Sequence, residues 1–226
     1  TTFQTEMLEE GYGNRSILLE NFLDFSPSRF PEENIPPNRK DLAEKKEKIV
    51  VYAGNFQSYQ GVSLLLEAAS EMKNYPIKFV LVGETPQGVS RMKQKADAYG
   101  ISDKFYFTGQ IPPHRVPLYI SLADTLVSPR ISGTNTPLKI YSFLKSGKPI
   151  VATRLWTHTQ VLNDDISILV DPDAKNLADG IRRALFTQEG ENKGKAAQRF
   201  AAEKYSYKKY REKLNNAVIN AVKKHK

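Results

Sequence analysis

The residues with the clearest chemical potential lie in one run, 133–141, between a short apolar stretch and a helix-like segment. Thr136 is a good N-cap, and the proline that follows it suits the first position of a helix. Gly133 and Asn135 permit unusual backbone angles just before that cap. Backbone N–H groups at a helix start, together with Lys139 in the first turn, favour an anion such as phosphate. The run therefore predicts an anion site in a strand–loop–helix unit.

The elements around this run alternate regularly from residue 49 onward. Short apolar segments predict strands at 49–53, 79–82, 105–107, 125–127, 150–152 and 166–170. Amphipathic segments predict helices at 62–73, 89–99, 115–122, 137–146 and 177–186, and a long final helix from about 191 toward 226 with a break near Tyr205-Ser206. This alternation predicts an α/β fold, a Rossmann-like parallel sheet of about six strands with helices on both faces.

Ligands of such sheets bind beyond the carboxyl ends of the strands. Five loops should therefore converge on one edge of the sheet, at 54–61, 83–86, 108–112, 130–136 and 153–159. Arg130 and Arg154 are cationic candidates there, although either could instead brace its loop through an ion pair. His158 is either a ligand contact or an ordinary loop histidine, and Trp156 either a core anchor or part of a cleft wall.

Composition bounds the function. The net charge of +8 indicates an anionic partner or a solvated basic face, and much of the surplus lies near the C-terminus. There is no cysteine, and the three histidines lack metal-ligand spacing, so we expect no metal and no cofactor. No nucleic-acid recognition motif, apolar span or signal peptide is present, which favours a cytoplasmic protein without a nucleic-acid partner.

Several motifs resemble a known family. Val51-Tyr52-Ala53-Gly54-Asn55 and the segment 59–68 resemble the start of the donor-binding domain of retaining glycosyltransferases of family four, which have the GT-B fold. The segments 107–109, 123–130, 147–153 and 204–207 resemble the middle strands, the Gly-x-Pro strand and the C-terminal segment of that domain. The resemblance covers roughly residues 49–215 and implies one half of a GT-B architecture.

The resemblance also divides the chain. Residues 1–24 resemble the end of the partner domain and the interdomain crossover, and 25–226 form the donor-binding domain, beginning with a proline-rich linker. The first residue is not methionine, so we expect a fragment whose acceptor-binding N-terminal domain is missing. Such an isolated half should be inactive.

The resemblance implies transfer of a sugar from a nucleotide sugar to a glycan, lipid or small-molecule acceptor, without metal. Lys139, Arg130 and Thr134 are the expected catalytic residues, with Lys139 and Arg130 stabilising the leaving diphosphate. The expected substrate-binding residues are Gly54, Asn55, Gln60, Gly83, Glu84, Gln110, Gly133, Asn135, Thr136, Ser142 and His158. Among them, Gly83, Glu84 and Gln110 should lie near the base. The expected partners are the nucleotide sugar, the missing domain and the inner face of a membrane.

The chain departs from the family pattern at the site itself. Thr134 and Ser142 stand where the family typically has two glutamates, and Asn55 and Gln60 stand where it often has Arg and Lys. Neutral groups are weaker partners than charged ones, so Lys139 is the expected substitute for the missing cations. Two alternatives stay open, a non-catalytic nucleotide- or sugar-binding domain of the same fold, and an unrelated α/β module whose basic face contacts nucleic acid or membrane.

Overall fold

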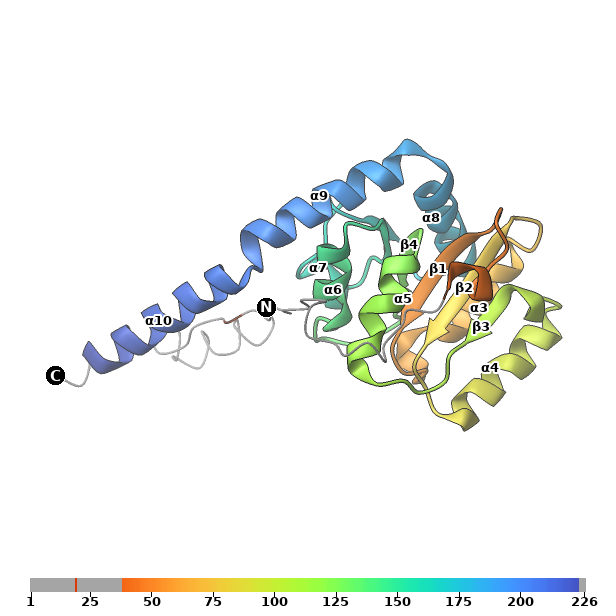
Figure 1. Cartoon of the computed structure of the whole chain (residues 1–226), viewed down its shortest axis with the longest axis horizontal. Helices are drawn as coiled ribbons and strands as arrows, with labels where there is room; N and C mark the ends of the chain where they lie inside the picture. The colour runs from red at the N-terminus through yellow and green to blue at the C-terminus, as the bar shows by residue number, and fades with distance from the viewer. Residues whose placement is uncertain (1–18, 20–37, 224–226) are drawn as a thin grey trace.

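The computed structural model describes residue 19 and residues 38–223. The expected domain remnant and most of the predicted linker lie outside these residues. The described chain forms one six-stranded sheet in the order β3-β2-β1-β4-β5-β6, and every pairing is parallel (Figure 1). The strands are β1 (Lys48–Ala53), β2 (Ile77–Val82), β3 (Phe105–Phe107), β4 (Thr125–Ser128), β5 (Ile150–Thr153) and β6 (Ile168–Val170). The predicted fold class is confirmed.

The central strand β1 explains why the sheet is covered on both sides. Val50 and Tyr52 lie in one core cluster, whereas Ile49 and Val51 lie in the other, because successive side chains of a strand point to opposite faces. The strand pairs with β2 on one side and with β4 on the other, so the strand order reverses direction between β1 and β4. Ligands of doubly wound sheets bind at such a switch point.

Helices cover the two faces in two groups. Core contacts place α3 (Val62–Ser70), α4 (Pro86–Ala98) and α8 (Ala174–Phe186) on one face, and α5 (Val116–Leu122), α6 (Lys139–Ser146) and α9 (Gln188–Lys204) on the other (Figure 1). The remaining helical segments are α2 (Arg39–Leu42), α7 (Trp156–Thr159), α10 (Tyr207–Lys223) and the short 3-10 turns η2 (Ser58–Gln60), η3 (Ser102–Lys104) and η4 (Pro113–Arg115).

The start of α6 differs from the sequence expectation. The helix begins at Lys139, and Leu138 precedes it without any side-chain cap, so the prediction of Thr136 as the N-cap is wrong. Leu138 already has helical angles, φ −56° and ψ −31°, and the Ile140 N–H donates to the Pro137 carbonyl at 3.0 Å in a tight entry turn. The helix therefore places Lys139 at its first position.

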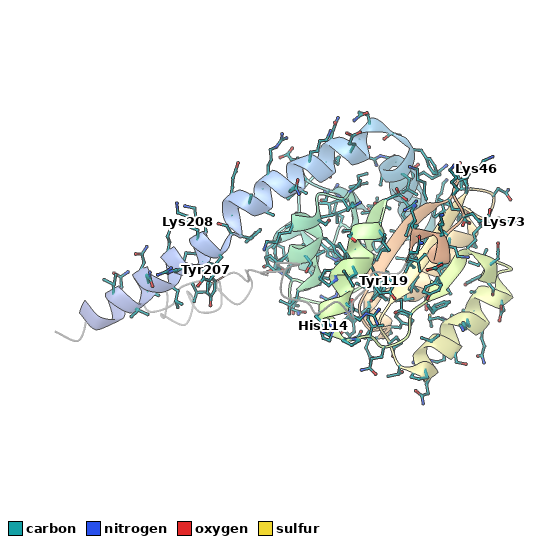
Figure 2. The ribbon with its side chains drawn as sticks, in the orientation of Figure 1. Lys46, Lys73, His114, Tyr119, Tyr207 and Lys208 are labelled. Atoms are coloured by element: carbon teal, nitrogen blue, oxygen red, sulfur yellow. The ribbon has the colours of Figure 1, made fainter. Side chains whose placement is uncertain are left out.

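The C-terminal part breaks where the sequence predicts. α9 ends at Lys204, and Tyr205 packs edge-on against Tyr141 of α6 with ring centroids 5.0 Å apart. The helix α10 then projects away from the sheet, and Figure 2 shows Tyr207 and Lys208 on this projecting part. Within the described residues, no helix has both the length and the apolar character needed to cross a membrane.

Candidate anion-binding site

Hydrogen bonds tie the loops at the carboxyl edge of the sheet to one another. The Gly54 N–H donates to the Val82 carbonyl at 2.9 Å, and the Gly83 N–H donates to the Gly109 carbonyl at 3.2 Å. The Ile131 N–H donates to the Tyr59 carbonyl at 3.0 Å. The first three predicted loops and the fourth loop therefore converge on one edge, as the parallel sheet requires.

Lys139 reaches from the first turn of α6 to the end of β1. Its Nζ lies 4.1 Å from the centroid of the Tyr52 ring and 3.3 Å from Oε1 of Gln60. A Cβ atom on Gly54 would lie only 3.4 Å from that Nζ, and Gly54 has φ +146°, an angle that L-residues rarely adopt. Glycine at this position thus leaves room for the ammonium group directly above the β1 exit.

The surroundings of Lys139 disfavour its charged form. Burial of the ammonium, together with repulsion by the Arg130 guanidinium, lowers the pKa of Lys139 to about 7. The residue as a whole is half-buried, and its ammonium group lies against the face of the Tyr52 ring. An anion bound at this edge would favour the protonated, positively charged form of Lys139.

Arg130 lies beneath the loop that follows β4 and is only 4% exposed. Its Nη1 donates to the Asn135 carbonyl at 2.8 Å and to Thr157 Oγ1 at 2.7 Å, and its guanidinium lies 5.1 Å from the Tyr59 ring centroid. Its Nε has no hydrogen-bond partner in the part of the chain that the structure describes. Gly133 packs on this guanidinium, since a Cβ atom there would lie 3.0 Å from Nη1.

Neither cation is neutralised by the protein. In residues 38–223 no carboxylate forms an ion pair with Arg130 or Lys139. Arg154 differs, because its guanidinium pairs with Asp164 at 2.7 Å, as in one of the two alternatives raised from the sequence. Buried charges are costly unless they are paired, so two cations without a carboxylate favour an external anion.

Glu84 is engaged by the protein itself. Its carboxylate accepts hydrogen bonds from the Phe56 N–H and from both the N–H and the hydroxyl of Thr85, the latter two at 2.9 Å. Burial would raise the pKa of Glu84, but these hydrogen bonds outweigh it and hold the pKa below its usual value. The residue has φ +101°, which is unusual for a non-glycine residue. Glu84 thus fastens the β1 loop to the β2 loop.

His158 lies under the site and is fully buried. Its Nδ1 lies 2.8 Å from the Thr153 carbonyl and its Nε2 lies 2.8 Å from Ser128 Oγ. The carbonyl can only accept, so we assign the proton to Nδ1 and the Ser128 hydroxyl as donor to Nε2. Burial, together with the nearby Lys139 and Arg130 charges, lowers the pKa of His158 to about 4. His158 joins the ends of β4 and β5, and the structure does not bring it to the ligand edge.

The other loop residues expected at the site fall into two groups, those whose carbonyls accept hydrogen bonds from other loops and those that lie at the edge. Asn135 is exposed, but its carbonyl accepts from both Arg130 and Thr157, and the Thr134 carbonyl accepts from Gln160 at 2.6 Å. Asn55 and Gln110 are exposed at the edge, and Thr136 is half-buried.

Ser142 lies elsewhere. It lines a cavity of about 460 Å³ between α5 and α6 with Pro117, Ile120, Ser121, Lys145, Ser146 and Lys148.

Three residues of the site were not singled out from the sequence, namely Tyr52, Tyr59 and Thr157. Each lies in a quoted motif or loop, but its role depends on partners far away in the chain. Trp156 is 55% exposed, which excludes the alternative of a core anchor. Within residues 38–223 no group of three His, Cys, Asp or Glu side chains could hold a metal ion.

Comparison with known proteins gives the family. Residues 34–207 match the family described as Glycosyl transferases group 1. The chain is 28% identical over 157 residues to the putative colanic acid biosynthesis glycosyl transferase WcaI of Escherichia coli, which covers 66% of this chain and 38% of that protein. It is 28% identical over 138 residues to the putative teichuronic acid biosynthesis glycosyltransferase TuaC of Bacillus subtilis, covering 61% of this chain and 33% of that protein.

Solved structures show the same fold. Anabaena Alr3699/HepE in complex with UDP superposes with a TM-score of 0.82 at 17% identity, over 96% of this chain and 61% of that one. A glycosyltransferase from Rickettsia africae has a TM-score of 0.79 at 19% identity, with the same coverage. The chain spans about a third of the length of the two curated relatives named above, from Escherichia coli and Bacillus subtilis.

The family match extends over all six strands of the described sheet and includes Arg130 and Lys139. It removes the alternative of an unrelated α/β module, and it confirms the resemblance on which the site was predicted. The chain belongs to the group 1 glycosyltransferases, with the GT-B type of fold.

Proposed function

We propose that this chain is the donor-binding half of a retaining glycosyltransferase that transfers a sugar from a nucleotide sugar to a glycan, lipid or small-molecule acceptor. One observation carries the proposal. Lys139 and Arg130 lie at the β1/β4 switch point, and no carboxylate of the described residues pairs with either cation. The diphosphate of a nucleotide sugar supplies the missing negative charge.

The two cations have different roles in this proposal. The Lys139 ammonium lies beside Gly54 at the open edge, so it contacts the diphosphate directly and stabilises the charge that grows on it as the sugar leaves. Arg130 is almost fully buried and holds Asn135 and Thr157, so it shapes the loop and adds positive potential from below. Thr134, the third expected catalytic residue, is exposed on that same loop.

Relatives support a choice of donor. HepE structures contain UDP, UDP with glucose, or UDP-glucose, which makes a uridine nucleotide the first probe for this chain. The names of the Escherichia coli and Bacillus subtilis relatives refer to polysaccharide biosynthesis, which supports a glycan acceptor. The acceptor-binding partner domain, the cytoplasmic location and contact with the inner face of a membrane stay predictions.

The alternative is a binding domain without catalysis. It is favoured by the neutral side chains at Thr134 and Ser142, where the family typically has glutamates. Both hypotheses require nucleotide binding, so they separate only at the transfer step. Turnover of the nucleotide sugar, measured with an acceptor-binding domain present, supports the enzyme, whereas tight binding with no turnover supports the alternative.

Calorimetric titration of the 226-residue chain with UDP, GDP and ADP tests the binding step. We expect one nucleotide to bind and Lys139→Ala to weaken it by about 10- to 100-fold, since a hydrogen bond to a charged group contributes about 1.5–3 kcal/mol. Lys73→Ala is the matched control, because Lys73 is exposed beyond the end of α3, away from the site (Figure 2). Absence of binding at millimolar concentration for all three nucleotides would refute the proposal.

A further inference from the structure

We propose that binding of the donor diphosphate is coupled to uptake of one proton by Lys139, and that Tyr52 and Gln60 are positioning residues that hold this amine for that step. The inference rests on the proposed function, because it names what happens when the same site fills. It gives Tyr52 and Gln60 a role in holding the amine and makes the affinity for the donor depend on pH.

The position of the Lys139 amine carries the inference. An ammonium group has three N–H donors, yet among residues 38–223 Nζ has one hydrogen-bond acceptor, Gln60 Oε1, at a long 3.3 Å. Another close neighbour is the face of the Tyr52 ring, at 4.1 Å from the centroid. A ring face attracts a cation but does not replace the hydrogen bonds lost from water. These surroundings therefore suit a neutral amine as well as an ammonium.

The charged and titratable groups around Lys139 point the same way. Arg130, after β4, repels the ammonium, and His158 of α7 is neutral at working pH because burial lowers its pKa to about 4. Burial raises the pKa of Tyr52, which keeps the β1 phenol neutral. Glu84, after β2, is the carboxylate of this edge, and it is saturated by Phe56 and Thr85. None of these groups offers Lys139 a counter-charge.

A bound diphosphate reverses this balance. Its oxygens supply both the missing hydrogen-bond acceptors and the negative charge, so the ammonium becomes the favoured form. The proton comes from the buffer acid. Tyr52 holds the amine in place through its ring, and its hydroxyl donates to the Asn55 carbonyl at 2.6 Å, which links the amine to the β1 loop.

The size of the effect follows from the pKa of Lys139, which is about 7. At pH 8 about 0.9 of the amine is neutral, so binding should take up about 0.9 proton. Between pH 6.5 and 8.5 the affinity should fall about 25-fold, because the fraction of Lys139 that is already protonated falls by that factor. UDP-glucose is the suitable probe, because its phosphates are diesters and take up no proton near neutral pH.

The test is calorimetric titration of the full chain with UDP-glucose at pH 8, in several buffers of different ionisation enthalpy. The dependence of the observed heat on the buffer gives the number of protons taken up. Lys139→Arg should still bind but take up fewer than about 0.2 protons, since arginine stays protonated. Gln60→Glu places a carboxylate beside the amine, so it should reduce both the proton uptake and the affinity.

Tyr52 needs a readout that a purely structural role would not change. Tyr52→Phe keeps the ring and should keep the proton uptake, whereas Tyr52→Leu removes the ring and should change the pH at which affinity begins to fall. If Tyr52→Leu does not fold, the Gln60→Glu and Lys139→Arg results decide the matter alone.

The outcomes separate the two proposals. Uptake near 0.9 proton that disappears in Lys139→Arg supports the inference. UDP-glucose binding with fewer than about 0.2 protons taken up in the unmodified chain, or uptake that persists in Lys139→Arg, overturns it and leaves the proposed function standing. Failure of every nucleotide and nucleotide sugar to bind overturns the proposed function and the inference together.

Discussion

Lys139→Met should stabilise the folded chain while it abolishes tight nucleotide binding. Methionine fills about the same space as the lysine stem and carries no charge. The lysine lowers stability because its pKa is about 7 in the folded chain and 10.5 when exposed. Each unit of difference is about 1.36 kcal/mol, so at pH 7 the charge costs at most about 4 kcal/mol. The cation–π contact with Tyr52 returns up to about 2 kcal/mol. We therefore expect a net gain of about 2 kcal/mol at pH 7.

The sign of the pH dependence follows from the direction of the shift. A lysine whose pKa is lowered in the folded state costs no stability above the unfolded value of 10.5, where the amine is neutral in both states. Its cost grows as the pH falls from 10.5 toward the folded-state pKa of about 7. The cost of the charge is about 5 kcal/mol at pH 6 and about 2 kcal/mol at pH 9. The advantage of Lys139→Met should therefore shrink by about 3 kcal/mol between pH 6 and pH 9.

Urea unfolding of both proteins at these two pH values measures this advantage, with Lys73→Met as the control for loss of a surface lysine. The m-values should be equal in all three proteins, so that midpoints report stability. A variant less stable than the parent, or an advantage that is the same at pH 6 and pH 9, would refute the reasoning. A stabilising change that removes binding is the trade-off expected of a charged residue kept for function.

Three further predictions concern residues that stabilise the fold. His158→Gln should remove about 2 kcal/mol of the stability that the parent loses between pH 7 and pH 5 in urea unfolding, because His158 has a pKa near 4 when folded and about 6.5 when unfolded. A loss that equals the parent's would show that His158 is not buried and neutral. Gly61→Ala should cost about 2–4 kcal/mol by thermal unfolding, since Gly61 has φ +72° and a Cβ atom there would meet a backbone oxygen at 1.8 Å. An unchanged midpoint would contradict this geometry. Asp124→Ala should cost about 1–3 kcal/mol, because the carboxylate accepts from Arg39 and from the Ile49 N–H, both at 2.7 Å. Nucleotide affinity, measured by titration, should stay the same in that variant, and a large loss would place Asp124 in the site.

The sheet could be predicted from the sequence because its strands are short, apolar and separated by helical segments. Phe105–Phe107 was predicted with its observed bounds, and the other strands differ by up to two residues at an end. The break at Tyr205-Ser206 also followed from the sequence, and Tyr205 is buried there against α6. Local patterns were sufficient for these elements because the spacing of apolar residues along the chain itself indicates a strand or a helix.

The start of α6 could not be predicted in the same way. Thr136-Pro137 has the local chemistry of a helix start, but the Asn135 carbonyl accepts hydrogen bonds from Arg130 and from Thr157, which lies in another loop. These tertiary contacts hold the loop in its own path, and the helix begins later, at Lys139.

The site itself was predicted only in part. The sequence predicted Lys139 in the first turn of a helix and Arg130 in the loop after a strand, and the structure places both cations near one another at the β1/β4 edge. The ring of Tyr52 under Lys139 was not found, since the contact joins β1 to α6 across distant positions and leaves no spacing pattern in the sequence. That no carboxylate within residues 38–223 pairs with either cation likewise emerges only from three-dimensional contacts.

The central claim is that the carboxyl edge between β1 and β4 binds a nucleoside diphosphate through Lys139. The most direct measurement is a titration of the ¹⁵N-labelled chain with UDP, followed by the amide signals. We predict saturable shifts confined to residues 54–61, 83–86 and 130–139, and a much weaker response of the same signals in Lys139→Ala. Shifts spread over the basic surface of α10, or signals at the β1/β4 edge that do not move at millimolar UDP, would contradict the account.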